Sequence, residues 1–447
     1  MVQSWIASLL LSAAVASCAA VPGLTANTPG SLGRRTPSPD VVTNNHMPVR
    51  TVRKSHSLRG KRAQRGQHGL HRRQSTYSGG QTNITDPEQL CYVAAVTWGD
   101  ETFDMLLDTG SSDTWLLQEG YKCLNSTGDQ VPKSNCVTSP NFSGNYTGGQ
   151  IGNVNFNATY GSASVAGTYG WEDITIAGIT VHNAQVASVT EAYFQQTGVS
   201  GLFGLAFSSL TKEWPGNDPS KNIMGEGQNY EPVFYKMVNQ KSSLPTFSFA
   251  PERNGNNGYL AFGGIPPVNT TGKTASTPIL TTQVKETVPV PAIDRDSYYT
   301  INIDGTTVTE VNTRTHKTNT TNFDSFIAIV DSGSSVSYLP SAIATALARS
   351  FSPAATSSGG TYEVPCNATA PKVAFDIGGV NFTISPADLI MQSVYDSDTG
   401  LCAIGFQDAA NDPPYILGGT FMNNVLTTFD LGALEMRFTA LAANNWK

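Results

Sequence analysis

The sequence predicts a mainly β protein built from two related halves. From Gln74 onward, short strand-like runs alternate with Gly, Asn and Ser, as expected for β-strands joined by turns. One short acidic motif occurs twice, each time directly after an apolar run. With 42 Gly, 25 Pro and only 14% charged residues, the composition suits a loop-rich β protein and excludes a coiled coil or a disordered acidic chain. At 447 residues, the chain is long enough for two domains with their own cores.

The first copy of the motif occupies residues 107–115, Leu-Asp-Thr-Gly-Ser-Ser-Asp-Thr-Trp. Residues 102–107 alternate in polarity and predict a strand that delivers Asp108 into a tight turn. Gly110 permits close backbone geometry, and the neighbouring hydroxyl groups can donate hydrogen bonds to the carboxylate. Considered alone, the motif would fit an ordinary hairpin or Asx-turn equally well.

The second copy changes that interpretation. Residues 328–335, Ala-Ile-Val-Asp-Ser-Gly-Ser-Ser, repeat the pattern around Asp331, and an aromatic residue followed by Leu comes after each copy. From average residue usage, two such motifs behind apolar runs would arise by chance on the order of once in a thousand chains. Two carboxylates offered by two similar halves predict a pair that shares a proton and holds a water molecule between them.

These motifs and their flanking sequences resemble the pepsin-like aspartic endopeptidases, particularly the secreted fungal members. The resemblance covers the chain from about Gln89 to the C terminus. It implies a bilobal pepsin-like fold, with two related β lobes and the active-site cleft between them. It also implies that Asp108 and Asp331 hydrolyse peptide bonds without a metal or a cofactor. One carboxylate would take a proton from water while the other, protonated, donates to the scissile carbonyl.

The same resemblance implies that three matched pairs of residues support the two carboxylates. They are Thr109 and Ser332, which would brace the loops against each other, Gly110 and Gly333, which would donate backbone hydrogen bonds, and Ser111 and Ser334, which would bond the outer carboxylate oxygens.

The run from Gly152 to Gly170 predicts a hairpin with a Tyr-Gly turn. In the family, such a hairpin is the flap that closes over the substrate. Tyr160 would then lie above the two acids, with Gly161 and Ser162 beside it and Trp115 behind it. Ser162 carries no charge that could bind a lysine, so we expect cleavage between large apolar residues and poor cleavage after Lys.

Two hydrophobic segments with central glycines, 200–207 and 415–421, are expected to pass beneath the catalytic loops. In the second of them, Gly419 stands where an Asp is common in the family, which puts local stability in doubt. Leu106 and Leu202 are expected in the apolar wall of the substrate site, as is Tyr193 or Phe194, although ordinary core positions explain these residues nearly as well. Residues 232–239 and 340–351 predict helices that begin at a proline.

The first 73 residues differ from the rest. Residues 1–20 have the apolar run and small residues of a signal peptide, and the run is too short to span a membrane. Residues 21–73 hold 11 Lys and Arg but one acidic residue, and they would not fold alone. The dibasic pairs Lys61-Arg62 and Arg72-Arg73 indicate a cleavable propeptide that inhibits its own enzyme, whereas a nucleic-acid-binding or membrane-binding arm is the alternative.

The remaining chain divides into an expected N-terminal lobe, 74–267, and a C-terminal lobe, 268–447. It retains 16 of the 27 basic and 33 of the 34 acidic residues, for a net charge of −17. This acidic body favours an acidic working environment and no nucleic-acid or membrane partner. It contains two histidines, His182 and His316, so a histidine triad or a zinc site has little to be built from. We expect a monomer that is secreted, with the vacuole as an alternative location.

The cysteines and glycosylation sequons agree with secretion. The resemblance implies one disulfide in each lobe, Cys123 with Cys136 and Cys366 with Cys402, although the sequence alone cannot establish the pairing. Cys91 is expected to be a buried thiol. The sequons are Asn83, Asn125, Asn141, Asn145, Asn157, Asn269, Asn319, Asn367 and Asn381.

Two other functional classes stay open on the sequence alone. A catalytically inactive relative could act as a binding protein or inhibitor, because a fold does not guarantee its activity. Both acids and the flap tyrosine are present, which argues against that class. A secreted glycosidase could also use two carboxylates, but its acids would not need to stand in two hydroxyl-rich copies of one turn.

Overall fold

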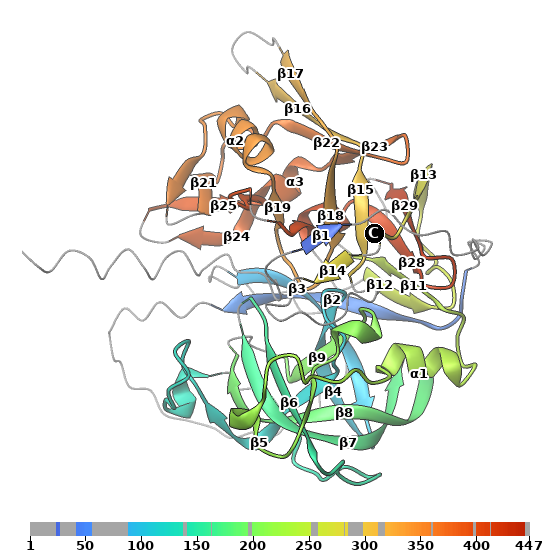
Figure 1. Ribbon diagram of the computed structural model, residues 1–447. Coiled ribbons are helices and arrows are strands. Elements are labelled where there is room, and N and C mark those ends of the chain that lie inside the picture. Colours follow the sequence, from blue (N-terminus) through green and yellow to red (C-terminus); the bar gives the residue numbers. More distant parts are fainter. Residues whose placement is uncertain are drawn as a thin grey trace, which may run out of the picture.

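In the computed structural model, the chain forms two β lobes that share one long sheet (Figure 1). The structure describes residues 24–26, 42–55, 88–136, 141–161, 163–194, 199–251, 258–280, 282–284, 298–311, 318–358, 361–396, 399–411 and 413–442. The mainly β prediction is confirmed.

The long sheet begins at residues 213–215 in the N-terminal lobe and ends at residues 270–278, which pair with the last strand of the chain. Its fourteen strands are, in spatial order, β10 (Glu213–Pro215), β6 (Val154–Thr159), β7 (Ser164–Ile176), β8 (Ile179–Tyr193), β5 (Trp115–Cys123), β9 (Gly201–Gly204), β4 (Glu101–Asp108), β3 (Glu88–Trp98), β2 (His46–Ser55), β12 (Gly258–Phe262), β11 (Thr246–Ala250), β28 (Val425–Asp430), β29 (Glu435–Leu441) and β13 (Thr270–Pro278).

The C-terminal lobe adds three smaller sheets. The first has the order β15 (Thr300–Ile303), β18 (Phe326–Val330), β27 (Tyr415–Leu417), β19 (Ser337–Leu339) and β26 (Phe406–Asp408). The second has β17 (Thr318–Phe323), β16 (Gly305–Val311), β22 (Lys372–Ile377) and β23 (Val380–Ile384). The third has β20 (Thr356–Ser358), β21 (Thr361–Pro365), β25 (Leu401–Ile404) and β24 (Ile390–Asp396), and β1 (Leu24–Ala26) pairs separately with β14 (Thr282–Val284).

Helices are short. They are α1 (Val233–Asn239), α2 (Ser341–Ser350), α3 (Pro386–Leu389) and α4 (Gly419–Met422), with single 3₁₀ turns at Lys133–Asn135, Ser208–Leu210 and Pro219–Lys221. The two predicted helices are confirmed as α1 and α2, each with a proline, Pro232 or Pro340, as its N-cap. The fixed φ of proline suits the start of a helix, where its missing N–H costs no hydrogen bond.

Part of the basic leader takes a place within the long sheet. Strand β2 lies between β3 and β12, with Arg50 opposite Val93 and Met47 opposite Leu260. This strand pairs with the body on both sides, which agrees with a leader that would not fold by itself. The dibasic pairs and the expected cleavage region lie outside the described residues.

Strand β4 has both faces buried, and this explains how it holds the first acid in place. Phe103, Met105 and Leu107 point into the large core, whereas Leu106 points into a second apolar cluster that contains Trp115. Burying one such side chain contributes about 1.5–3 kcal/mol. The strand that ends at Asp108 is therefore fixed from both sides.

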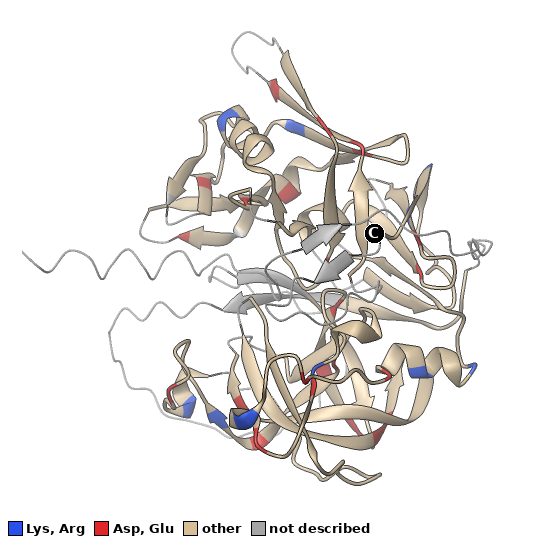
Figure 2. Ribbon diagram, in the orientation of Figure 1, with Lys and Arg blue, Asp and Glu red and all other residues tan. Residues whose placement is uncertain are grey.

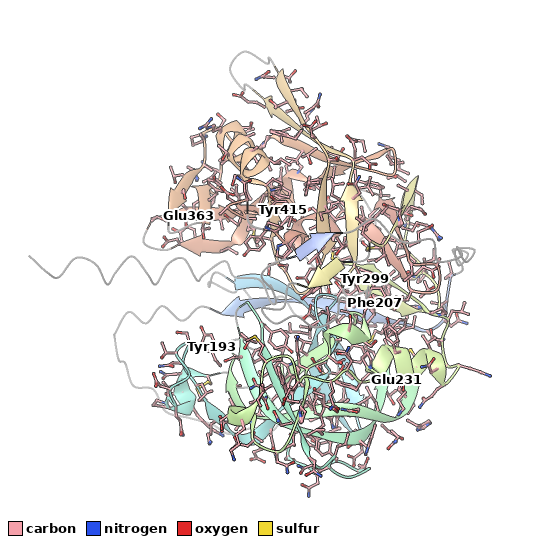
Figure 3. All side chains as sticks on the ribbon, viewed as in Figure 1. Tyr193, Phe207, Glu231, Tyr299, Glu363 and Tyr415 are labelled. Carbon is pink, nitrogen blue, oxygen red and sulfur yellow. A yellow bond between two sulfur atoms is a disulfide. The ribbon has the colours of Figure 1, made fainter. Side chains whose placement is uncertain are left out.

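Aromatic residues join the two lobes beneath the site. The hydroxyl of Tyr299 donates to the carbonyl oxygen of Leu205 at 2.6 Å, and its ring lies 5.0 Å from that of Phe207 (both rings are labelled in Figure 3). Tyr299 also packs edge-on against Phe429 at 4.6 Å. These contacts set how one half lies against the other.

The two disulfides are confirmed. Cys123 is bonded to Cys136, and Cys366 to Cys402, with Cα–Cα distances of 5.9 and 5.0 Å. Cys91 lies in β3, but its side chain is outside the described residues, so the prediction of a buried thiol stays a prediction.

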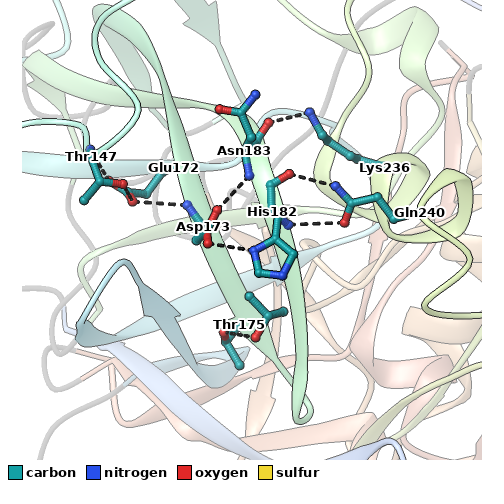
Figure 4. A network of polar contacts seen from close by, with 9 residues as sticks. Thr147, Glu172, Asp173, Thr175, His182, Asn183, Lys236 and Gln240 are labelled. Carbon is teal, nitrogen blue, oxygen red and sulfur yellow. Dashed lines mark hydrogen bonds and ion pairs between the residues drawn. The ribbon is translucent and has the colours of Figure 1, made fainter.

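Polar contacts tie α1 to the hairpin formed by β7 and β8 (Figure 4). The side chain of Gln240 and the backbone of His182 exchange two hydrogen bonds, at 2.7 and 3.2 Å. The His182 ring lies 2.7 Å from Asp173, and Lys236 donates to the carbonyl oxygen of Asn183. His182, the histidine that the structure describes within residues 74–447, thus takes part in solvent-exposed contacts that support the fold.

Figure 2 marks Lys and Arg at scattered positions of the described ribbon and Asp and Glu on both lobes. Among the described residues, none of the helices has the length and apolar character needed to cross a membrane.

Candidate active site

Asp108 and Asp331 stand at equivalent places in the two halves. Asp108 ends β4, which runs parallel to β9, and its carbonyl oxygen accepts a hydrogen bond from the backbone N–H of Leu205 at 2.8 Å. Asp331 follows β18, which runs parallel to β27, and its own N–H donates to the carbonyl oxygen of Leu417 at 3.1 Å. Both acids are buried, with exposures of 1% and 3%.

Thr109 and Ser332 join the two turns reciprocally. The N–H of Thr109 donates to Ser332 Oγ at 3.0 Å, and the N–H of Ser332 donates to Thr109 Oγ1 at 2.9 Å. Each hydroxyl then donates across the interface, to the carbonyl oxygens of Val330 and Leu107 at 3.0 and 2.9 Å. Because every donor here is buried and paired, separating the turns would leave several unsatisfied polar groups.

Two glycines hold the carboxylates and leave room for them. Gly110 N–H donates to Asp108 Oδ1, and Gly333 N–H donates to Asp331 Oδ1, both at 2.8 Å. A Cβ atom on Gly110 would lie 2.7 Å from Asp331 Oδ1, and one on Gly333 would overlap Asp108 Oδ1. Each carboxylate therefore lies against the opposite turn, where any side chain would displace it.

The serines that follow these glycines differ. Ser111 Oγ donates to Asp108 Oδ2, whereas Ser334 Oγ is buried and has no hydrogen-bond partner among the described residues. The expected bond from Ser334 to the second carboxylate is therefore absent here. Among the described residues, a hydroxyl donor is thus found for Asp108 and not for Asp331.

This difference is reflected in the protonation of the pair. Burial raises the pKa of Asp108, while hydrogen bonds from Ser111, Gly110 and Asp331 lower it again. Burial and the charge of Asp108 raise the pKa of Asp331 well above its usual value, against the hydrogen bond from Gly333. Two adjacent carboxylates cannot both ionise in a buried site, so Asp331 retains its proton to higher pH than Asp108.

The predicted flap hairpin is formed by β6 and β7, with Tyr160 N–H donating to the carbonyl oxygen of Ala163 at 2.7 Å. The Tyr160 hydroxyl accepts a hydrogen bond from Trp115 Nε1 at 2.9 Å, and both rings are buried. Burial and the charges of Asp113 and Asp108 raise the pKa of Tyr160 well above its usual value. Gly161 follows in the turn, and Ser162 lies outside the described residues.

The expected apolar wall lies mostly inside the second cluster. Leu106 and Leu202 are opposite each other in β4 and β9, and each is 2% exposed. Phe194 packs edge-on against Trp115 at 5.2 Å, while Tyr193 is partly exposed (Figure 3). Contact of these residues with substrate stays a prediction.

The space beside Gly419 explains why this chain has a glycine where an Asp is common in the family. A Cβ atom there would lie 2.9 Å from the carbonyl oxygen of Ser335 and 3.1 Å from the hydroxyl of Tyr92. The Tyr92 hydroxyl donates to Asn423 Oδ1 at 2.7 Å. A larger residue would crowd this bonded tyrosine, so glycine suits the site.

Two residues near the acids were not predicted from the sequence. Tyr298 is buried, and burial with the charges of Asp331 and Asp108 raises its pKa. Asp113 is buried in the first turn, where burial raises its pKa and two tyrosine hydroxyls bond it. The sequence did contain a signal for Asp113, because the two motifs differ there: the second has an apolar residue, Val336, at the equivalent position. Nothing comparable in the sequence singled out Tyr298.

Among the described residues, no group of three or more His, Cys, Asp or Glu side chains is arranged to hold a metal ion.

Comparison with known proteins agrees with this architecture. A solved structure of an aspartic proteinase from Irpex lacteus superimposes with a TM-score of 0.54, covering 80% of this chain and 96% of the other at 18% identity, which supports the fold. A probable aspartic-type endopeptidase of Aspergillus fumigatus is 33% identical over 82% of each chain. Rhizopuspepsin-2 of Rhizopus niveus is 28% identical over 82% of this chain and 83% of its own. The eukaryotic aspartyl protease family profile matches residues 91–441, and the chain therefore belongs to that family of aspartic endopeptidases.

Proposed function

We propose that Asp108 and Asp331 are the catalytic pair that hydrolyses polypeptides. The observation that carries this assignment is the reciprocal bond between Thr109 and Ser332, since it brings two buried carboxylates from distant parts of the chain against each other's turn. A water molecule held between the acids would be the nucleophile. No covalent intermediate with the protein is required.

In this mechanism, Asp108 is the ionised base and Asp331 the protonated acid. Asp108 has the Ser111 hydroxyl to stabilise its charge, while no hydroxyl of the described part of the chain bonds Asp331 in this way. Asp108 accepts a proton from water as the water oxygen attacks the scissile carbonyl, and Asp331 donates its proton to the carbonyl oxygen. As the C–N bond of the resulting gem-diol breaks, Asp108 gives its proton to the leaving nitrogen and Asp331 takes up the proton of a diol hydroxyl group, which returns both acids to their starting states.

Activity should be lost on both sides of an acidic optimum. Below the pKa of Asp108, both acids are protonated and the base is missing. Above the raised pKa of Asp331, both are ionised and the acid is missing. The charged pair would also be harder to keep buried at neutral pH.

The flap and its neighbours support a substrate with large apolar residues around the cut. Tyr160 would cover the bound peptide, assisted by Gly161 and Ser162, and Trp115 holds the tyrosine from behind. A peptide library read by mass spectrometry tests this specificity. A profile led by Lys before the cleaved bond would contradict it.

The basic leader would be a propeptide removed from a secreted precursor that works as a monomer. Its residues 21–73 carry a net charge of +10 against −17 for the body. A leader Lys or Arg would pair with the ionised dyad at neutral pH, and acidification would weaken the pair. The pairing of β2 with β3 and β12 supports a leader held on the body. Secretion and glycosylation are supported by the signal-like residues 1–20 and the nine sequons.

A precursor with both dibasic pairs mutated tests the propeptide. We expect it to be inert near neutral pH and active after acidification, whereas the chain that begins at Gln74 needs no activation. Equal activity of the uncleaved precursor at both pH values would show that the leader serves secretion or folding alone.

The decisive experiment is hydrolysis of denatured globin at low pH by the leader-free chain, with and without a statine-type inhibitor. We expect cleavage that the inhibitor blocks and that Asp108→Asn abolishes. Cleavage that persists in Asp108→Asn would overturn the assignment of the pair.

A further inference from the structure

The segment 211–230 adds a strand to the outer edge of the flap hairpin. Its strand β10 pairs antiparallel with β6, so that Glu213 lies opposite Phe156. β10 is the end strand of the sheet, which makes β6 an interior strand. Trp214 Nε1 also donates to the carbonyl oxygen of Asn157 at 2.9 Å, three residues before the flap tyrosine. The first strand of the flap is therefore bonded on both sides.

A buried amide strengthens this attachment. Asn155 is 1% exposed, and its Nδ2 donates to the carbonyl oxygen of Gly216 at 3.0 Å and to Asn222 Oδ1 at 2.9 Å. Asn222 Nδ2 donates back to Asn155 Oδ1 at 3.0 Å. The backbone N–H of Asn153 donates to Asn217 Oδ1 at 2.9 Å. Because a buried amide left unpaired is costly, these bonds hold the segment against β6.

The end of the same segment is bonded to the turn that carries the first acid. Tyr230 donates its hydroxyl hydrogen to Asp113 Oδ1 at 2.9 Å. The same oxygen accepts from Tyr169 of β7 at 3.0 Å and from the backbone N–H of Lys212 at 3.1 Å. Asp113 is 1% exposed, so its carboxylate depends on these three donors.

The segment closes on itself between its two attachments. The N–H of Tyr230 donates to Thr211 Oγ1 at 3.0 Å, and the N–H of Gln228 donates to the carbonyl oxygen of Glu213 at 2.7 Å. Glu213 also accepts a hydrogen bond from Gln185 of β8. A closed segment can transmit a restraint from one attachment to the other, whereas an open loop would not.

We propose that the segment 211–230 is a clamp that fixes the flap relative to the Asp108 turn, with Asp113 and Tyr230 as positioning residues for peptide hydrolysis. The inference rests on the proposed role of Tyr160 as the substrate cover. The clamp bonds both the flap strand and the catalytic turn, so it orders the flap before substrate arrives. Ordering the flap in advance lowers the entropic cost of binding, and its loss raises KM more than it changes kcat.

Tyr230→Phe and Asn155→Leu test the two attachments separately. Tyr146→Phe is the matched control, because its hydroxyl also donates within this lobe, to the carbonyl oxygen of Thr168 at 2.6 Å, but it does not touch the clamp. We expect each clamp variant to raise KM for a long peptide about threefold to tenfold, as loss of a buried hydrogen bond would. Amide exchange in residues 154–159 should quicken by about the same factor. The control should change neither quantity beyond about twofold.

Amide exchange needs no catalytic activity, so it can also be measured in the Asp108→Asn protein. Inactivity of the enzyme would therefore not hide the result, and faster exchange would support the clamp even if the catalytic assignment failed. Unchanged exchange and KM in both clamp variants, relative to Tyr146→Phe, would overturn the clamp. A fall in kcat alone, with KM unchanged, would overturn it as well.

Discussion

The turns that carry Asp108 and Asp331 share a backbone design but differ in the side chains around the acids. Each turn follows a strand that pairs parallel with a second strand, β9 or β27. Within the turns, the N–H groups of Gly110 and Gly333 donate to the carboxylates of Asp108 and Asp331 at 2.8 Å. Ser111 donates to the first carboxylate, whereas Ser334 lacks a described partner. The repeated backbone brings the acids together, and the unequal side chains decide which acid keeps the proton.

A second difference lies two residues beyond these serines. The first turn has buried Asp113, bonded by two tyrosines, and the second has buried Val336 in the same place. Among the described residues, Asp113 accepts hydrogen bonds from Tyr230 and Lys212 of the segment 211–230, whose strand β10 pairs with β6. The N-terminal half thus supplies one acid together with the hairpin of β6 and β7, while the C-terminal half supplies an acid whose turn has an apolar residue at the equivalent position.

The largest expected effect is the loss of activity when either acid is replaced, and it should be equally large for both. Asp108→Asn and Asp331→Asn each keep the shape of the side chain but remove one member of the acid–base pair. Peptide hydrolysis should fall by about 10³-fold or more in either variant. The assay is cleavage of a quenched peptide at acidic pH, with circular dichroism as the control for folding. Appreciable turnover by a sequence-verified single variant would contradict the mechanism.

The next effect tests whether the turns depend on each other. A methyl group on Gly110 would meet Asp331, and one on Gly333 would meet Asp108. Gly110→Ala and Gly333→Ala should each lower kcat/KM by about 10²-fold, because the opposite carboxylate must move. Gly152→Ala is the control, since a Cβ atom there would have no neighbour within 4 Å. Equal activity of all three variants would mean that the acids do not lie as described.

The third effect tests the unequal hydrogen bonding of the two acids by Ser111 and Ser334. Ser111→Ala removes the hydroxyl donor from ionised Asp108 and should lower kcat/KM about tenfold. It should also move the acidic limb of the pH–activity profile to higher pH, because the lost donor favoured the charged form. Ser334→Ala removes a hydroxyl without a described partner, so its effect should stay within about threefold. A larger fall in kcat/KM for Ser334→Ala than for Ser111→Ala would assign the base to Asp331.

The smallest effect is on stability. The folded-state pKa of Asp331 is raised, so the folded protein holds this proton more tightly than the unfolded chain. Stability is therefore lost as pH rises from the unfolded pKa through the folded one. Asp331→Asn cannot ionise and should melt about 2–4 °C above wild type near neutral pH. The difference should vanish near pH 3 in thermal melts of the leader-free chain, where Asp331 is neutral in both states. A variant less stable than wild type at neutral pH would refute the raised pKa.

The sequence by itself determined the elements whose patterns are local. The alternation over residues 102–107 predicted β4, the run 152–170 predicted the flap hairpin, and Pro232 marked the start of α1. The duplicated motif, read with its resemblance to a known family, predicted which two acids belong together. Such signals lie within a few neighbouring residues, so the chain carries them without knowledge of its fold.

Only the tertiary structure decided how the two turns differ. The bond between Tyr230 and Asp113 spans 117 positions, and the pairing of β10 with β6 joins residues about 60 positions apart in the chain. The isolation of Ser334 and the place of β2 between β3 and β12 also depend on neighbours from distant segments. Hydrogen bonds in a buried site depend on the distance and direction between atoms, and these are set when the whole chain packs.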